Sequence, residues 1–350
     1  MRPYGLIGDA HQGFKAYSSE RRTQEAIDVL AQGLLLLKDK PIVLFVGDFF
    51  DDTVVPNWVK KQIIALKEEY HNQEWLILGG NHDSTKTYSS VSMLDVLGEV
   101  ANITVVNSHK METIDICGLR VLCIPHVKSQ TEYLKIVDDC IAMDDNWDVA
   151  MLHSLVNSSL DLGPNDLNID LYRLDLLSQK VGTIWIGHQH HPVEIVQGKI
   201  YIPGSIMEFD FGQLGDKFVY TEDGTLLLLE QPRKMVRMEM ECPVSAIEFV
   251  STLKLTEDSI YRIDIKSIPI EDYSNIKSAC DLIETQFKGD VMFNLYKLGH
   301  KELQVTAIDA RFDLLEEFDN FCVENNIAVG RMKDILTDAI AEVTVEEEDD

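Results

Sequence analysis

The 350-residue chain lacks the features by which several classes of protein are recognised. No apolar run approaches the roughly 20 residues needed to span a bilayer, and the N-terminal residues do not have the layout of a signal peptide. The six cysteines are scattered, with no Cys-x-x-Cys pair, so we expect reduced thiols. These absences argue against a membrane protein and a disulfide-rich secreted protein, and they predict a cytoplasmic one.

Basic residues are also scarce, because 31 Lys and Arg stand against 59 Asp and Glu and leave a formal net charge of −28. Such a chain has no general electrostatic attraction for nucleic acid. A nucleic-acid substrate would therefore require bound metals, local cations or a basic partner to offset the repulsion. Part of the excess lies in the acidic tail at 346–350, a block of like charges that we expect to be disordered.

Apolar strand-like segments alternate with helix-like ones in the first part of the chain. We expect strands at 4–8, 41–47 and 75–79 and helices at 20–37, 56–70 and 89–97. This βαβ rhythm predicts a layered α/β domain. Further strands are expected at 120–124, 149–152 and 183–186, with a helix at 131–143. Hairpin-like segments at 193–196, 199–202, 217–221 and 225–229 suggest a second sheet packed on the first.

The pattern changes near residue 235, where we place a domain boundary after a first domain at 1–235. Residues 236–305 predict a small α+β cap, with helices at 244–253 and 273–287 and strands at 259–266 and 291–298. Residues 306–350 predict two amphipathic helices, 312–325 and 331–342, before the acidic tail. The apolar stripes of these helices could pack on their own domain or bind a partner.

Polar side chains that suit metal binding follow five of the expected strands. They are Asp9 and His11, then Asp48, then Asn81, His82 and Asp83, then His153, and finally His188 and His190. In an open α/β sheet, ligands bind beyond the carboxyl ends of the strands, so these residues can converge. A mixed set of imidazoles, carboxylates and one amide suits a pair of divalent ions.

Each element also has a simpler interpretation. Asn81 and Asp83 could cap a helix, the segment after Gly47 could be an ordinary turn, and His153 could be a hydrogen-bonded core histidine. The order of the motifs, each directly after an apolar strand, favours the metal site over a set of coincidences.

The motifs Asp-x-His, Gly-Asp, Gly-Asn-His-Asp, His and Gly-His-x-His make residues 4–230 resemble the calcineurin-like metallophosphoesterases. Within that superfamily, the chain is similar to the nuclease subunits of the SbcC–SbcD type and their tailed-phage counterparts. The segments that carry this closer resemblance are 9–13, Arg21 with Arg22, and 203–206. The resemblance implies a four-layer α/β sandwich with two central mixed sheets, followed by a small α+β cap and C-terminal helices.

The resemblance also implies roles for the site residues. Asp9, His11 and His190 would hold one metal, and Asn81, His153 and His188 the other, with Asp48 bridging. Two Mn²⁺ ions are expected, with Mg²⁺, Fe or Zn as alternatives. Such a pair activates water and stabilises the charge of a phosphodiester transition state. His82 would assist departure of the leaving oxygen, held by Asp83.

One position departs from the pattern, because Asp51 stands where the cellular nucleases commonly carry a histidine. An acid there would repel a phosphate unless it is protonated or points away. Lys15, Arg21, Arg22, Lys86 and Lys128 are candidate DNA contacts, although ordinary surface positions explain them equally well.

The expected function is that of a metal-dependent DNA exonuclease or endonuclease subunit in recombination, repair or replication. The resemblance implies a coiled-coil, SMC-like ABC ATPase partner, docked on 306–350, and a homodimer. If the source is a phage, the compartment is the host cytoplasm. The alternatives are a phosphatase or small-molecule phosphodiesterase on the same site and, with less support, a non-catalytic scaffold, which would be expected to lack ligands.

Overall fold

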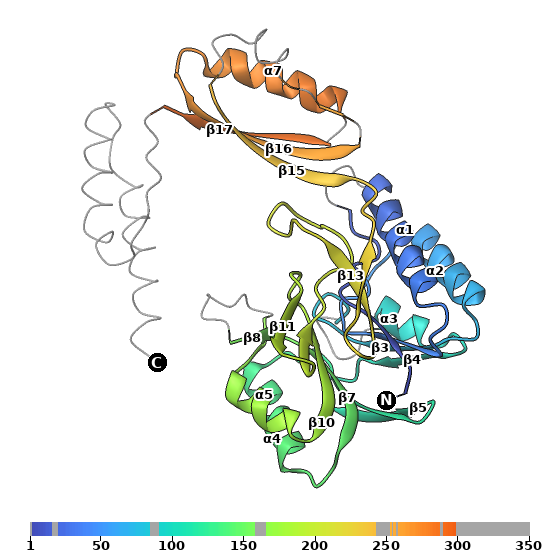
Figure 1. Ribbon diagram of the computed structural model, residues 1–350. Coiled ribbons are helices and arrows are strands. Elements are labelled where there is room, and N and C mark those ends of the chain that lie inside the picture. Colours follow the sequence, from blue (N-terminus) through green and yellow to red (C-terminus); the bar gives the residue numbers. More distant parts are fainter. Residues whose placement is uncertain are drawn as a thin grey trace, which may run out of the picture. The chain divides into compact units, whose positions relative to one another are not determined.

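The computed structural model describes residues 2–15, 20–84, 91–157, 166–242, 253, 255–256, 258–287 and 290–298 (Figure 1). The chain divides into two compact units, Met1–Tyr296 and Lys297–Asp350. The predicted helices at 312–325 and 331–342 and the acidic tail lie outside the described residues, as does almost all of the predicted helix at 244–253.

The first sheet has six strands in the order β14-β13-β1-β2-β3-β4. Their bounds are β1 Gly5–Ile7, β2 Ile42–Phe45, β3 Glu74–Leu78, β4 Ile103–Val106, β13 Lys217–Thr221 and β14 Leu226–Leu229. β1 to β4 are parallel, whereas β13 and β14 join antiparallel at the edge next to β1. The parallel strands are almost continuously apolar because both faces of the sheet are covered.

The second sheet also has six strands, in the order β11-β12-β10-β7-β6-β5. Their bounds are β5 Glu112–Ile116, β6 Leu119–Ile124, β7 Trp147–His153, β10 Val181–Gly187, β11 Val193–Val196 and β12 Ile200–Ile202. The expectation that the four segments after residue 192 belong together in this sheet is wrong for the last two. Only β11 and β12 join it, whereas β13 returns to pair with β1, at Leu6 opposite Tyr220.

The two sheets pack face to face, and helices cover both outer faces (Figure 1). α1 Glu20–Leu36, α2 Asn57–Glu69 and α3 Met93–Leu97 pack on the first sheet, and α4 Gln130–Ala142 and α5 Leu171–Ser178 on the second. Two short strands, β8 Leu155–Val156 and β9 Asn168–Ile169, form a separate parallel pair, and β8 directly follows β7 in the chain. The predicted four-layer α/β sandwich with two mixed sheets is confirmed.

Aromatic side chains fill the space between the two sheets. Trp185 stacks on Tyr201 with ring centroids 4.5 Å apart, and its indole N–H donates to the Tyr4 hydroxyl at 3.0 Å. All three residues are buried. This arrangement satisfies the polar ends of large apolar groups and holds the two sheets in one register.

A third sheet follows, in the order β15-β16-β17, with bounds β15 Lys234–Glu241, β16 Ser259–Ile268 and β17 Val291–Lys297. The helix α7 Tyr273–Gln286 packs against it through Ile276, Cys280 and Ile283. The predicted boundary at 235 falls inside β15, and the sheet belongs to the same compact unit as the sandwich. No helix in the described part of the chain is long and apolar enough to cross a membrane.

Candidate metal centre

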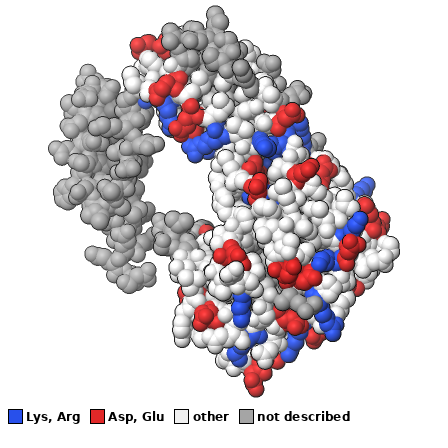
Figure 2. Space-filling view, viewed as in Figure 1, with Lys and Arg blue, Asp and Glu red and all other residues white. Residues whose placement is uncertain are grey.

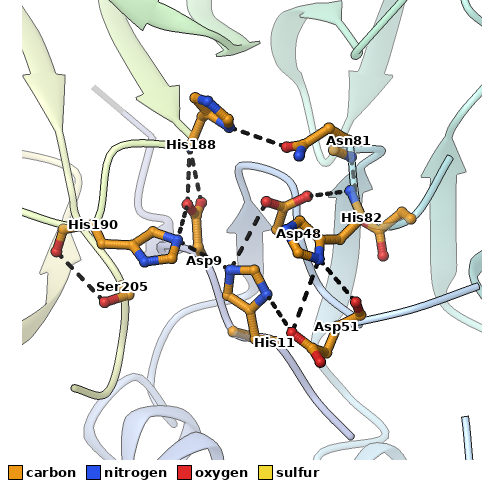
Figure 3. Close-up of polar contacts among 12 residues, drawn as sticks. Asp9, His11, Asp48, Asp51, Asn81, His82, His188, His190 and Ser205 are labelled. Atoms are coloured by element: carbon orange, nitrogen blue, oxygen red, sulfur yellow. Dashed lines mark hydrogen bonds and ion pairs between the residues drawn. The ribbon is translucent and has the colours of Figure 1, made fainter. Parts of the chain in front are cut away.

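The predicted ligands converge at the carboxyl ends of β1, β2, β3, β7 and β10 (Figure 3). These strands belong to both sheets, so the site lies where the two sheets present the same edge. The structure brings together seven residues for which metal ligation is predicted: Asp9, His11, Asp48, Asn81, His153, His188 and His190. Residues up to about 180 positions apart in the chain, such as Asp9 and His188, are in hydrogen-bond contact.

One half of the site consists of Asp9, His11 and His190, whose ligand atoms all lie within 4.8 Å of one another. The Nε2 atoms of His11 and His190 face each other at 3.1 Å, and His190 Nε2 lies 3.4 Å from an Asp9 carboxylate oxygen. Asp9 is fully buried and accepts a hydrogen bond from the backbone N–H of His188 at 2.9 Å. This half can hold one divalent ion.

The other half consists of Asp48, His153 and His188, again within 4.8 Å, with the amide of Asn81 between the two imidazoles. Asn81 Oδ1 lies 2.9 Å from His153 Nε2 and 3.0 Å from His188 Nδ1. Asp48 Oδ2 lies 3.3 Å from His153 Nε2 and 3.8 Å from His11 Nε2. Asp48 therefore touches both halves, as a bridging ligand must.

The hydrogen bonds of three imidazoles define which ring nitrogen faces the centre. His153 Nδ1 donates to the carbonyl of Val46 at 2.9 Å, and His11 Nδ1 donates to Asp51 Oδ1 at 3.2 Å. His188 Nε2 lies 3.3 Å from Asp166 Oδ1. A histidine ligand normally donates its second N–H to an outer oxygen in this way. The inward nitrogens are thus Nε2 of His153 and His11 and Nδ1 of His188.

The backbone at the strand ends adopts unusual conformations to aim these side chains. His11, Asp48 and His188 have positive φ values of 41°, 47° and 89°. Such conformations are uncommon for residues other than glycine and concentrate at functional sites. Before Asp48, a Cβ on Gly47 would lie 2.1 Å from His153 Nδ1. Only glycine allows the two strand ends to approach this closely.

Burial and mutual charge set the ionisation of the ligands. Burial, with the neighbouring His153, lowers the pKa of His188 to about 4, and burial with His11 lowers that of His190 to about 3. Both imidazoles are therefore neutral at pH 7, the state that binds metal. Burial disfavours charge on His153 as well, but the carboxylates of Asp48 and Asp9 outweigh it and raise its pKa to about 9.

His82 differs from the other histidines at the site because its side chain is 42% exposed. Its Nδ1 donates to the backbone carbonyl of Asp51 at 2.8 Å, and its ring packs edge-on against His11 at 4.7 Å. Although burial opposes it, the charge of Asp48 and the Asp51 carbonyl raise the pKa of His82 above its ordinary value. An exposed imidazole that readily carries a proton at the rim of the centre suits a proton donor.

The prediction that Asp83 holds His82 is wrong. Asp83 is buried, and its carboxylate accepts hydrogen bonds from the backbone N–H groups of Phe49, Phe50 and Gly80 at 2.9–3.1 Å. It therefore ties the end of β3 to the end of β2. Burial and the nearby Asp48 raise the pKa of Asp83 to about 6.

Asp51 is the residue whose role the sequence did not reveal. Its carbonyl accepts a hydrogen bond from His82 and its carboxylate lies against His11, so it orients the predicted proton donor and a predicted metal ligand together (Figure 3). The one indication in the sequence was that an aspartate stands at position 51, where relatives commonly carry a histidine. Asp166 was also missed; it lies outside every motif, and only folding brings it to His188.

The predicted DNA contacts are dispersed. The prediction that Arg22 contacts DNA is wrong, because its side chain is fully buried. Arg22 pairs with Glu25 at 2.8 Å and donates to the Glu208 carbonyl. Arg21 is half-exposed but forms ion pairs with Glu25 and Asp290, each at 3.6 Å. Lys15 and Lys128 are exposed, and Lys86 lies outside the described residues.

The surface agrees with this dispersal. On the face shown in Figure 2, the basic and acidic side chains of the described residues are interspersed and form no extended positive patch. The cleft at the centre has a volume of about 540 Å³ and, among the described residues, no Lys or Arg lines it.

The donor set fits two divalent ions. Four imidazoles, two carboxylates and one amide oxygen divide into two groups that share Asp48. Mixed nitrogen and oxygen donors of this kind suit Mn²⁺, Fe or Zn²⁺, which the geometry does not distinguish. No ligand is missing, which is the opposite of what a non-catalytic scaffold predicts.

Comparison with protein families agrees with a phosphoesterase site. A family model described as calcineurin-like phosphoesterase matches residues 2–192. No curated protein matches. One similar solved structure is a purple acid phosphatase from yellow lupin (Lupinus luteus) seeds, 18% identical with a TM-score of 0.32, over 57% of this chain and 40% of that one. Another is a dimetal phosphatase from Danio rerio, 14% identical with a TM-score of 0.29, over 55% of this chain and 70% of that one.

Proposed function

Because the chain belongs to the calcineurin-like phosphoesterase family, we propose that it hydrolyses phosphodiester bonds in DNA with two divalent metal ions. Phosphoester hydrolysis at a metal centre follows from the family and the ligand set. The choice of a diester, and of DNA, goes further and rests on the shape of the site.

The observation that carries the proposal is the presence of two hollows beside His82. The larger is the 540 Å³ cleft, which also reaches Asn81, His188 and Asp166. The smaller, of about 190 Å³, is lined by Phe14 and Phe209 together with His82. A phosphodiester carries one substituent on each of two oxygens, and two adjoining hollows beside the centre provide room for both. A phosphate monoester would need only one.

The residues of the chain have distinct tasks in this reaction. When bound, the two ions supply Lewis-acid activation of water and neutralise charge on the phosphoryl group. Asp9, His11 and His190 would hold one of them, Asn81, His153 and His188 would hold the other, and Asp48 could contribute to both. His82 donates a proton to the oxygen that leaves, and the Asp51 carbonyl fixes its Nδ1 so that Nε2 is available to the substrate.

The alternative is a phosphatase acting on monoesters at the same centre. No Lys or Arg among the described residues lines either hollow, so no side-chain cation there is placed to neutralise the additional charge of a terminal phosphate. This favours the diester, which carries one negative charge fewer.

A direct comparison of substrates tests the proposal. In the presence of Mn²⁺, the protein should cleave single-stranded or duplex DNA and leave nucleoside monophosphates largely intact. Rapid release of phosphate from monophosphates, with intact DNA, would identify a phosphatase instead. The same reactions with Mg²⁺, Fe²⁺ and Zn²⁺ would identify the metal that supports turnover.

The partner remains a prediction. The low content of basic residues supports a complex in which another subunit contributes DNA affinity, and an SMC-like ABC ATPase in DNA recombination, repair or replication would suit this need. Deleting residues after 305, which lie outside the described part, should abolish such a complex and preserve hydrolysis of a small phosphodiester. A complex that survives the deletion would refute this docking site.

A further inference from the structure

The smaller hollow beside His82, here called the aromatic recess, has walls unlike those of the main cleft. Its lining residues are His11, Phe14, Asp51, His82, His190, Phe209, Asp210 and Gln213. Four of these, His82, His190, Asp210 and Gln213, also line the main cleft. The aromatic recess therefore opens beside the reacting centre and is not a separate cavity elsewhere in the fold.

Aromatic rings form most of its wall. Phe209 packs edge-on against Phe14 and against His11, with ring centroids 4.9 Å apart in each pair. His11 in turn meets His82 at 4.7 Å. Phe209 is buried, whereas Phe14 and His82 retain exposed surface. A flat, apolar group that enters the recess would meet ring surfaces on several sides.

The polar atoms at the recess exclude a phosphate as its occupant. Asp51 and Asp210 bring two carboxylates, and Gln213 brings a carboxamide that donates to Asp210. No Lys or Arg is among the described residues that line it. A second phosphate would be repelled, whereas a neutral ring with N–H groups at its edge would find hydrogen-bond acceptors.

The volume agrees with a single ring system. Pockets for drug-sized ligands have volumes of roughly 300–1,000 Å³, and the aromatic recess at about 190 Å³ is smaller. It suits one flat heterocycle next to the scissile phosphate.

From these observations, and on the basis of the function proposed above, we propose that the aromatic recess binds one nucleobase of the substrate, adjacent to the phosphate that is cleaved. The base stacks against Phe14 and His82. Because a base in the recess cannot remain paired, the bound nucleotide is unpaired, and single-stranded DNA is a better substrate than an intact duplex.

Dinucleotides with a single phosphodiester bond give a sharp test. Three substrates are compared in Mn²⁺: one with both bases, one lacking the 5′ base and one lacking the 3′ base. Stacking of a base on an aromatic side chain, measured by alanine substitution, corresponds to about 5- to 150-fold in binding. We expect removal of one of the two bases to lower kcat/KM by a factor in this range, and removal of the other to have a smaller effect.

The variant Phe14→Ala should remove this discrimination. It should lower kcat/KM for the dinucleotide with both bases more than kcat/KM for the sensitive abasic dinucleotide, so that the ratio of the two values approaches one. Phe14→Trp, which restores a stacking surface, should recover the preference. Tyr172→Ala, which removes an aromatic side chain that is 72% exposed and lines neither hollow, is the matched control. Metal content of each variant checks that the centre remains intact.

The outcomes separate this inference from the proposed function. If wild-type protein cleaves all three dinucleotides equally, or if Phe14→Ala slows the complete and the abasic substrates by the same factor, the recess does not bind a base. If no dinucleotide is cleaved while p-nitrophenyl phosphate is hydrolysed, the proposed diesterase function is itself wrong, and the inference fails with it.

Discussion

Asp51 provides the most informative perturbation of the metal centre. Its carboxylate oxygen Oδ1 lies 3.2 Å from His11 Nδ1, and the side chain is 29% exposed. In Asp51→Asn the side chain keeps its shape and loses its charge. The backbone carbonyl that holds His82 remains. The substitution therefore alters the support of one metal ligand and leaves the predicted proton donor in place.

The expected size of the effect follows from this geometry. The Asp51 carboxylate fixes the His11 tautomer that presents Nε2 to the centre. Loss of such an outer partner costs about 10- to 100-fold in metal affinity, which corresponds to about 1.4–2.7 kcal/mol. The affinity for one of the two ions should fall by up to this amount, because only His11 loses a charged partner. Asp51→Ala should have at least as large an effect.

Isothermal titration of the metal-free protein with Mn²⁺ measures the two affinities without reference to turnover. Asp52→Asn is the matched control, since Asp52 is the adjacent residue, carries the same charge and is exposed. If Asp51→Asn and Asp52→Asn both bind two ions as tightly as the wild type, the carboxylate has no role in ligand orientation. If Asp51→Asn lowers the affinity for both ions equally, a general charge effect is responsible.

Three further predictions concern separate parts of the molecule. His82→Ala should retain both metals by elemental analysis and lose about 10²- to 10⁴-fold in turnover, as expected for a general acid; loss of metal would assign His82 to the ligand set. Arg233 is buried and pairs with Glu25 at 2.5 Å and Asp290 at 2.7 Å, so Arg233→Met should lower the free energy of unfolding by about 3–5 kcal/mol in urea titrations, and a change below 1 kcal/mol would refute the pairing. Burial raises the pKa of Tyr4 to about 12. Because the folded state favours the neutral phenol, Tyr4 contributes about 2–3 kcal/mol to the free energy of unfolding below pH 10, and this contribution disappears as the pH rises from 10 to 12. Stability measured against pH for Tyr4→Phe should lack this component, and identical alkaline profiles would contradict the assignment.

The sequence alone predicted the α/β class, most of the strands and helices, though not α5 or β15, and the seven residues that converge at the candidate metal centre. These features are local, because each ligand follows a short apolar run whose carboxyl end must lie at the edge of a sheet. Burial on both faces requires apolar strands, and His11, Asp48 and His188 adopt positive φ where three of these strands end. A motif at a strand end is therefore visible without knowledge of the strand order.

The tertiary structure decided what depends on contacts between distant residues. The placement of β13 beside β1 follows from pairing partners more than 200 residues apart, for which periodicity gives no indication. From the sequence, Arg22 is expected to be a surface cation, whereas the structure shows it buried against Glu25 and Glu208. The backbone carbonyl of Asp51, and not the carboxylate of Asp83, accepts the hydrogen bond from His82, because the fold turns the Asp83 side chain toward the backbone N–H groups of other residues. The sequence by itself thus determined which residues can bind metal, whereas only the fold decided which of their atoms face the centre, which groups orient them and which surfaces surround the substrate.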